Sequence, residues 1–161
     1  MKIRGRRRKT ITIEEACNLD TTNSKVIKIK EITEGCMPEQ YGDALDLKCA
    51  ETLYVEKGYR AKIKLGVAME IPEGYYALLI PRSSTADKFH IIQTNSIGLI
   101  DNDYKGDDDE WAMPILALEN TCINKGDRVC QFLIQKKTPI ELLQVETLGN
   151  DNRGGFGSTG V

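Results

Sequence analysis

Tyr75-Tyr76-Ala77-Leu78-Leu79-Ile80 is the stretch of sequence that decides the fold class. A short, dense apolar run that is bounded by turn residues predicts a strand buried on both faces. Met113–Leu118 and Arg128–Ile134 are runs of the same kind, whereas Lys25–Ile32 and the segment from Ala61 to Val67 alternate between apolar and polar residues, as half-buried strands do. Turn residues separate these runs and no long helical period follows residue 24, so we expect an all-β sandwich or barrel-like fold.

The two ends of the chain differ from this strand-rich body. We expect a basic extension and linker over residues 1–24, a β-barrel over 25–149 and a flexible, Gly-rich tail over 150–161. Six of the 22 Lys and Arg residues lie in residues 1–10, and the other 16 stand against 24 Asp and Glu, so the body is acidic although the net charge is only -2. The basic arm 1–10 suits a solvated terminus, or a contact to nucleic acid or a membrane surface, and we favour the solvated terminus.

Composition excludes several kinds of chemistry. His90 is the only histidine, which removes a multi-histidine zinc site. The five cysteines contain no CxxC pair, which indicates a reducing compartment. The longest apolar stretch, Tyr75–Pro81, is far shorter than the roughly 20 residues that a membrane helix needs. We therefore expect a cytoplasmic protein without a membrane partner.

Pro81-Arg82-Ser83-Ser84-Thr85-Ala86 follows the most apolar run and joins a guanidinium to consecutive hydroxyl groups. These donors suit a phosphate group, because its oxygens accept hydrogen bonds. The same residue types also favour the N-terminus of a helix, so the segment alone leaves both interpretations open.

Asn95–Gly106 brings two short apolar stretches together at a polar hairpin. Exposed backbone in such a hairpin presents donors and acceptors to a flat heterocycle. Asp101 ends the apolar Gly98–Ile100 stretch, and we expect its carboxylate to be partly desolvated and able to act as a general base. The alternative is an ordinary β-turn in which Asn and Asp bond to the local backbone.

Two other polar segments carry weaker signals. Asp107-Asp108-Asp109-Glu110 is better interpreted as a solvated loop than as a metal site, because adjacent carboxylates repel one another and point in different directions. Arg128 and Gln131 are three positions apart, so a regular strand places them on opposite faces. The sequence contains no Walker A loop, no GxGxxG after a strand and no GxSxG elbow, so phosphate binding must use other residues.

Taken together, the polar segments resemble the motifs of the homotrimeric dUTPase family, the deoxyuridine 5′-triphosphate nucleotidohydrolases. The five segments follow in the family's order: Asp43-Ala44-Leu45-Asp46-Leu47, Pro81-Arg82-Ser83-Ser84-Thr85-Ala86, Gly98-Leu99-Ile100-Asp101-Asn102-Asp103-Tyr104-Lys105-Gly106, Gly126-Asp127-Arg128-Val129-Cys130-Gln131 and Gly154-Gly155-Phe156-Gly157-Ser158-Thr159-Gly160. The likeness spans about Lys25 to Val161.

The resemblance implies a jelly-roll-like β-barrel whose three subunits build shared active sites. It implies that dUTP is hydrolysed to dUMP and pyrophosphate with Mg²⁺, which keeps uracil out of DNA and supplies dUMP for thymidylate synthesis. Asp101 would accept the proton of the water that attacks the α-phosphorus, and Asp46 would reach the magnesium ion through water only.

The resemblance also implies three groups of substrate-binding residues. Uracil would be received by Asn95, Gly98, Leu99 and Ile100, with Phe156 stacked over it when the tail closes. Tyr104 would lie under the deoxyribose and exclude a 2′-hydroxyl. The phosphates would be contacted by Arg82, Ser83, Ser84 and Gln131 from the body and by Arg153, Gly157 and Ser158 from the tail.

The sequence departs from the family's pattern at both ends. Ala44 and Leu45 replace a glycine and an aromatic residue in the first motif, and Asp151 stands where the family has a lid arginine, with Arg153 three residues before Phe156. The rival enzyme is a dCTP deaminase or a bifunctional deaminase-dUTPase, which the Tyr104 turn and the Gly-Phe-Gly tail disfavour. A further alternative is a phage-type dUTPase with an added regulatory role.

Overall fold

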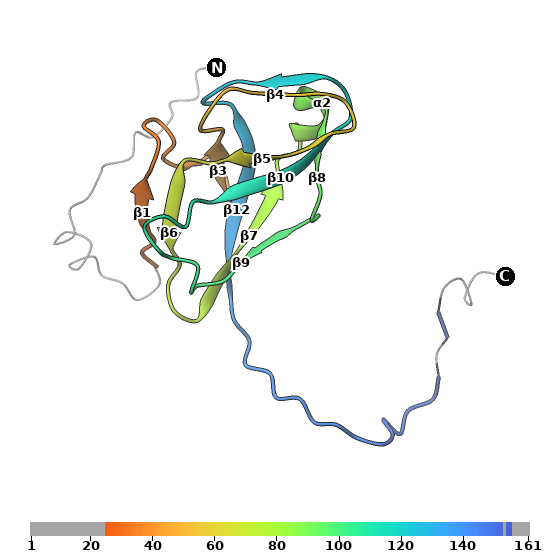
Figure 1. The fold of residues 1–161 in the computed structure, drawn as a ribbon. Coiled ribbons are helices and arrows are strands. Elements are labelled where there is room, and N and C mark those ends of the chain that lie inside the picture. The colour runs from red at the N-terminus through yellow and green to blue at the C-terminus, as the bar shows by residue number, and fades with distance from the viewer. Residues whose placement is uncertain (1–24, 153, 156–161) are drawn as a thin grey trace, which may run out of the picture.

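A computed structural model describes residues 25–152, 154 and 155, and within these ranges antiparallel strands dominate (Figure 1). The predicted class needs one correction, since a short helix, α2 (Thr85–Phe89), interrupts the strands, so the described part of the chain is mostly β with one short helix rather than all-β. The basic arm 1–10, the rest of the 1–24 extension, Arg153 and the tail from Phe156 lie outside the described residues.

The strands of the described residues form four antiparallel groups that together enclose the core (Figure 1). The largest sheet has the order β2 (Glu39–Gln40), β3 (Leu45–Lys48), β12 (Arg128–Lys136), β7 (Tyr75–Pro81) and β9 (Gly98–Ile100). A second sheet has the order β5 (Arg60–Lys64), β10 (Ala112–Ala117) and β8 (Ile91–Gln93). The pairs β1 (Lys28–Glu31) with β6 (Val67–Glu70) and β4 (Leu53–Val55) with β11 (Thr121–Ile123) complete the fold.

The three apolar runs form the strands that the sequence predicts. β7 lies between β12 and β9 in the large sheet, and its Ala77 and Leu79 are fully buried. The aromatic centre of the core is an edge-to-face contact between Trp111 and Phe132, with ring centroids 5.1 Å apart and an interplanar angle of 75°. Leu78 and Ile80, on the opposite face of β7, are only partly buried, so the predicted burial of this strand on both faces is wrong for the single chain.

The alternating segment from Ala61 to Val67 is two strands rather than one. Gly66 separates β5 from β6 with a φ of +68°, and a Cβ built there would lie only 2.7 Å from Cys36 Sγ. The turn therefore requires glycine, because a side chain would meet both an unfavourable backbone conformation and a steric overlap.

β12 contains a bulge that overturns one expectation. Arg128 pairs with Lys48, but the register shifts so that Cys130 pairs with Leu47 and Gln131 with Asp46. Because the bulge inserts one extra residue into β12, two residues that are three positions apart share a face. Arg128 and Gln131 therefore lie on the same face of the sheet, not on opposite faces.

Candidate functional site

A buried carboxylate lies at the centre of one polar cluster. Asp46, on β3, has a side chain that is 7% exposed, and its Oδ2 atom lies 3.1 Å from Arg82 Nε and 3.2 Å from Arg128 Nη1. Arg82 Nη1 also donates to the carbonyl oxygen of Arg128 at 3.3 Å. Two guanidinium groups and one carboxylate leave one net positive charge, which suits a polyanion.

The segment after β7 is anchored by Thr85. The backbone N–H of Arg82 donates to Thr85 Oγ1 at 2.9 Å, and this hydroxyl donates to the carbonyl oxygen of Val129 at 2.8 Å. Ser84 occupies the N-cap of α2 but its side chain makes no capping bond, and Ser83 and Ser84 are both exposed. The segment is thus a helix start, while its serine hydroxyls remain available to a ligand.

Tyr41 and Gln131 complete this first cluster. The guanidinium of Arg128 lies 4.4 Å from the centroid of the Tyr41 ring, and the Tyr41 hydroxyl donates to Glu39 Oε2 at 2.6 Å. This hydrogen bond raises the pKa of Tyr41 and, after the stronger effect of Lys48, helps to lower the pKa of Glu39. Gln131 Nε2 donates to the carbonyl oxygen of Pro81 at 3.3 Å.

The hairpin that leads into β9 forms the second part of the site. Ser96 turns the chain with a φ of +58°, and Gly98 then pairs with Leu79 of β7. A Cβ at Gly98 would lie 3.1 Å from Leu79 Cβ and 3.6 Å from Asn95 Nδ2, so glycine lets the Asn95 side chain lie close to the strand. The predicted residues Asn95 and Gly98 are thereby brought together.

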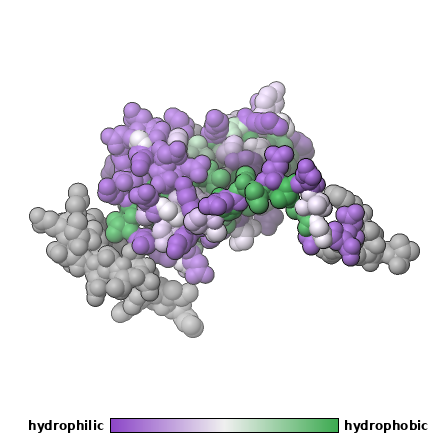
Figure 2. Space-filling model, turned by 90° about the horizontal axis from the view of Figure 1, so that it is seen from below, coloured by the Kyte–Doolittle hydropathy of each residue, from purple (hydrophilic) through white to green (hydrophobic). Residues whose placement is uncertain are grey.

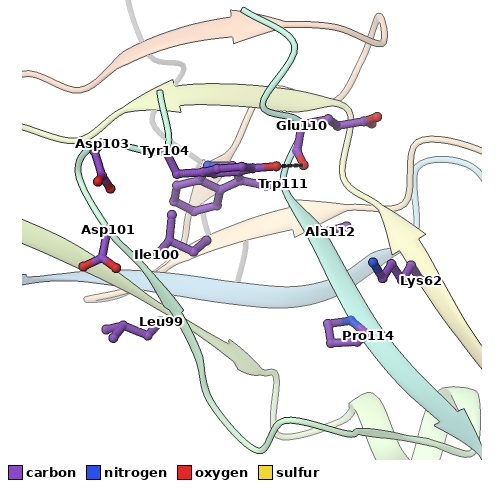
Figure 3. A pocket seen from close by; sticks show the side chains of 10 residues that line it. All are labelled: Lys62, Leu99, Ile100, Asp101, Asp103, Tyr104, Glu110, Trp111, Ala112 and Pro114. Atoms are coloured by element: carbon purple, nitrogen blue, oxygen red, sulfur yellow. Dashed lines mark hydrogen bonds between the residues drawn. The ribbon is translucent and has the colours of Figure 1, made fainter. Parts of the chain in front are cut away.

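A pocket of about 540 Å³ opens beyond the other end of β9 (Figure 3). Asp101 and Asp103 lie on one side of it and Lys62 and Pro114 on the opposite side. The hydroxyl of Tyr104 reaches across and donates to the carbonyl oxygen of Glu110 at 3.2 Å. The full lining is Lys62, Leu99, Ile100, Asp101, Asp103, Tyr104, Glu110, Trp111, Ala112 and Pro114.

The expected partial desolvation of Asp101 is wrong for the single chain. Its side chain is exposed, because the chain leaves the sheet after Ile100 and turns toward Tyr104. Two carboxylates of the acidic run that follows accept hydrogen bonds from the backbone, one local and one from a distant turn. Asp109 Oδ2 accepts from the Gly106 N–H at 2.6 Å, and Glu110 Oε1 accepts from the Gly66 N–H at 3.0 Å.

The pocket and the arginine cluster are far apart in one chain. Ile100, next to Asp101, pairs with Ala77 near the start of β7, whereas Arg82 follows Pro81 at the end of β7. Five residue steps of about 3.3 Å put roughly 17 Å between the two points along the strand. One phosphate group therefore cannot contact Asp101 and Arg82 of the same chain.

The structure adds residues that the sequence analysis did not assign to the site. Arg128 joins Arg82 at Asp46, Tyr41 covers Arg128, and the buried Gln93 contacts Asn95. Arg128 could have been found, because it lies inside the fourth motif. Nothing in the sequence relates Tyr41 or Gln93 to their partners, because these contacts depend on how β8, β12 and the loop before β3 are packed. The predicted tail residues Arg153, Phe156, Gly157 and Ser158 lie outside the described residues.

Comparison with known proteins assigns the chain to a protein family. The profile of the dUTPase family matches residues 33–160. The deoxyuridine 5′-triphosphate nucleotidohydrolase of the SPbeta prophage in Bacillus subtilis is 49% identical over 144 residues, covering 89% of this chain and 94% of the relative. The corresponding enzyme of Corynebacterium diphtheriae is 39% identical over 126 residues, covering 74% of this chain and 81% of the relative. The chain belongs to the dUTPase family. It is a dUTP diphosphatase, which hydrolyses dUTP, and the deaminase alternative is not supported.

Solved structures agree with the fold. The dUTPase of Staphylococcus bacteriophage 80alpha, determined with dUPNHPP, superposes with a TM-score of 0.74 at 28% identity and covers 86% of this chain and all of that one (100%). A D95N mutant of the dUTPase from phage phi11 of S. aureus, described with a structural Mg(II) ion, gives a TM-score of 0.67 at 27% identity, covering 77% of this chain and 99% of that one. Among the described residues, no helix is long and apolar enough to cross a membrane.

Proposed function

We propose that Asp101 is the general base of dUTP hydrolysis. Its carboxylate accepts a proton from a water molecule, the water oxygen bonds to the α-phosphorus, and the bond from that phosphorus to the bridging oxygen breaks, so that pyrophosphate leaves and dUMP remains. The observation that carries this role is that Asp101 lines the 540 Å³ pocket directly after the hairpin strand.

The hairpin and the pocket suit the nucleoside part of dUTP. Asn95, Gly98, Leu99 and Ile100 offer backbone and amide groups to uracil, and Tyr104 provides a flat ring at the pocket for the deoxyribose. A deoxyribose packed on this ring leaves a ribose 2′-hydroxyl without a hydrogen-bond partner, which makes discrimination against UTP steep.

The arginine cluster suits the triphosphate. Arg82 and Arg128 share Asp46 and keep further N–H groups for phosphate oxygens, while Ser83, Ser84 and Gln131 add neutral donors nearby. We propose the tail residues Arg153, Gly157 and Ser158 as further phosphate contacts and Phe156 as a ring that stacks over uracil, so that the closed tail excludes water from the site.

The donor set fits a magnesium ion that is held mainly by the substrate. Within the described residues, no group of three or more His, Cys, Asp or Glu side chains is arranged to hold a metal ion. Mg²⁺ keeps most of its waters and takes phosphate oxygens, so a single carboxylate that acts through water is sufficient. Both arginine contacts of Asp46 are to Oδ2, and Oδ1 is therefore the oxygen that we propose for a metal-bound water. The ion would neutralise phosphate charge as pyrophosphate forms.

Because Asp101 and Arg82 of one chain are roughly 17 Å apart along β7, we propose that a complete site combines the pocket of one subunit with the arginine cluster of another.

The described C-terminal arm, residues 138–152, leaves the barrel after β12 (Figure 1). Its three leucines are largely exposed, with Leu142 at 95%, Leu143 at 85% and Leu148 at 82%. Hydrophobic residues also gather in a band across the barrel face seen from below (Figure 2). Both features support assembly into the homotrimer that the family resemblance implies.

Substrate selectivity tests the proposed site. The purified protein with Mg²⁺ should release pyrophosphate from dUTP and at most traces from dTTP, dCTP and UTP. Equal release from UTP would remove Tyr104 from its proposed role, and ammonia release from dCTP would show a deaminase activity as well.

A further inference from the structure

Gln93 is a buried polar side chain beside the uracil hairpin. It lies in β8 and is 7% exposed. Its amide nitrogen Nε2 makes two contacts, to the carbonyl oxygen of Leu79 at 3.2 Å and to Asn95 Oδ1 at 2.8 Å. Its Oε1 atom is buried and has no hydrogen-bond partner among the described residues.

The contact to Leu79 fixes which way the Gln93 amide faces. A backbone carbonyl only accepts hydrogen bonds, so the NH₂ group of Gln93, and not its oxygen, must face Leu79. Since the same NH₂ group also meets Asn95, the Asn95 side chain must turn its own oxygen toward Gln93. The Nδ2 amino group of Asn95 then points away from Gln93, as a donor on the hairpin.

We propose that Gln93 is a positioning residue for base selection, because it holds the Asn95 amide in the orientation that presents a donor. This inference rests on the proposed role of Asn95 in uracil binding. A donor at this place pairs with the O4 carbonyl of uracil and meets another donor, the N4 amino group, in cytosine. The Leu79 carbonyl of β7 thereby sets the orientation of the Gln93 amide, and Gln93 sets the orientation of the Asn95 amide that faces the substrate base.

The unpartnered Oε1 atom argues against a purely structural role for Gln93. A buried carbonyl without a partner is unfavourable, and an apolar residue of similar size would avoid it. If Gln93 served only to fill space in β8, then Gln93→Leu would leave selectivity unchanged. If Gln93 orients Asn95, the same substitution frees the Asn95 amide to rotate and to offer its oxygen to cytosine.

The test compares kcat/KM for dUTP with kcat/KM for dCTP in Gln93→Leu, Asn95→Ala and the double variant. We expect Gln93→Leu to lower the dUTP-to-dCTP ratio by at least about tenfold, and to have no further effect when Asn95 is already alanine. Thr121→Val, a second buried polar residue in the separate β4–β11 pair, is the matched control and should keep the wild-type ratio.

Each other outcome overturns a different statement. An unchanged ratio in Gln93→Leu with a lowered ratio in Asn95→Ala overturns the role of Gln93 and leaves that of Asn95 intact. An unchanged ratio in both variants overturns both roles. If Gln93→Leu does not fold, an NMR titration of the wild-type protein tests the proposal. Addition of dUMP should shift the side-chain NH₂ signals of Asn95 more than those of Gln93, and unshifted Asn95 signals would contradict the proposal.

Discussion

Asp46 Oδ2 lies 3.1 Å from Arg82 Nε, in a carboxylate that is almost completely buried. The same oxygen lies 3.2 Å from Arg128 Nη1, so one atom of β3 fixes two guanidinium groups that come from the ends of two other strands. Neither arginine has to be ordered when a triphosphate binds, because the carboxylate has already ordered both of them. Removal of the carboxylate should therefore affect the phosphate end of the substrate and leave the base end unchanged.

Asp46→Asn should raise the KM for dUTP by about 10- to 100-fold and leave the inhibition constant of deoxyuridine within about twofold, because only dUTP carries the triphosphate that we propose the two arginines bind. Steady-state kinetics with deoxyuridine as a competitive inhibitor measure both quantities. Asp43→Asn, which changes an exposed residue just before β3, is the matched control. A parallel loss of deoxyuridine binding in Asp46→Asn would instead indicate general misfolding.

We expect the ring of Tyr41, and not its hydroxyl, to affect the KM for dUTP. The ring covers the Arg128 guanidinium at 4.4 Å, and a cation–π contact at an exposed site contributes about 0.5–1 kcal/mol. Tyr41→Leu should therefore raise the KM for dUTP by roughly two- to fivefold with little change in kcat, whereas Tyr41→Phe keeps the ring and should behave as wild type. A loss in Tyr41→Phe equal to that in Tyr41→Leu would assign the effect to the bond with Glu39.

Asp101→Asn should reduce kcat by about 10³-fold or more and leave dUTP binding nearly intact, because asparagine keeps the shape of the carboxylate and cannot accept the proton. Isothermal titration of the variant with dUTP measures binding directly, since turnover is slow. Asp103→Asn, on the same side of the pocket, is the matched control and should keep most of the activity. Turnover near that of the wild type in Asp101→Asn would remove this residue from the mechanism.

Two truncations should separate the arm from the tail. A chain that ends at Asn152 loses the proposed lid, and we expect low turnover with an unchanged oligomeric state. A chain that ends at Lys137 also loses the exposed aliphatic residues 140–148, so we expect it to dissociate. Light scattering after size exclusion gives both masses. A trimer in the shorter chain would show that the barrel face alone carries assembly.

Asp127 should make the stability of the fold dependent on pH. Burial by itself would raise its pKa, but hydrogen bonds from Lys88 at 2.9 Å and from the Asn124 N–H at 3.0 Å hold the pKa below the ordinary value of 3.8. A lowered folded-state pKa contributes stability that is present above the ordinary pKa and is lost as pH falls through the folded-state pKa.

Asp127→Asn should therefore lower the free energy of unfolding by about 1 kcal/mol at pH 7, and the difference from wild type should become smaller as the pH falls below 3.8. Chemical denaturation at several pH values measures this. Glu119→Gln removes an exposed ion pair with Lys57 and should have a much smaller effect at either pH. A constant difference between wild type and Asp127→Asn across this range would show that the carboxylate does not carry the effect.

Much of the fold follows from local sequence pattern. The runs that begin at Tyr75, Met113 and Arg128 become β7, β10 and β12, because dense apolar segments between turn residues have no stable arrangement other than burial in a sheet. Two local details were not predictable with the same ease. The break at Gly66 depends on the approach of Cys36 from a distant loop, and α2 begins at Thr85, whose hydroxyl is buried against Val129.

The sequence by itself determined the family and the reaction, and it supplied the segments in which we propose the chemistry, because these depend on residue types in a fixed order along the chain. Only the tertiary structure decided how those residues meet. The bulge in β12 turns Arg128 onto the face of Gln131 and Asp46, the packing of β8 under the hairpin joins Gln93 to Asn95, and the length of β7 separates Asp101 from Arg82. Each of these relationships depends on strand register, which is set when sheets pack around one core, and no local pattern of residues specifies it.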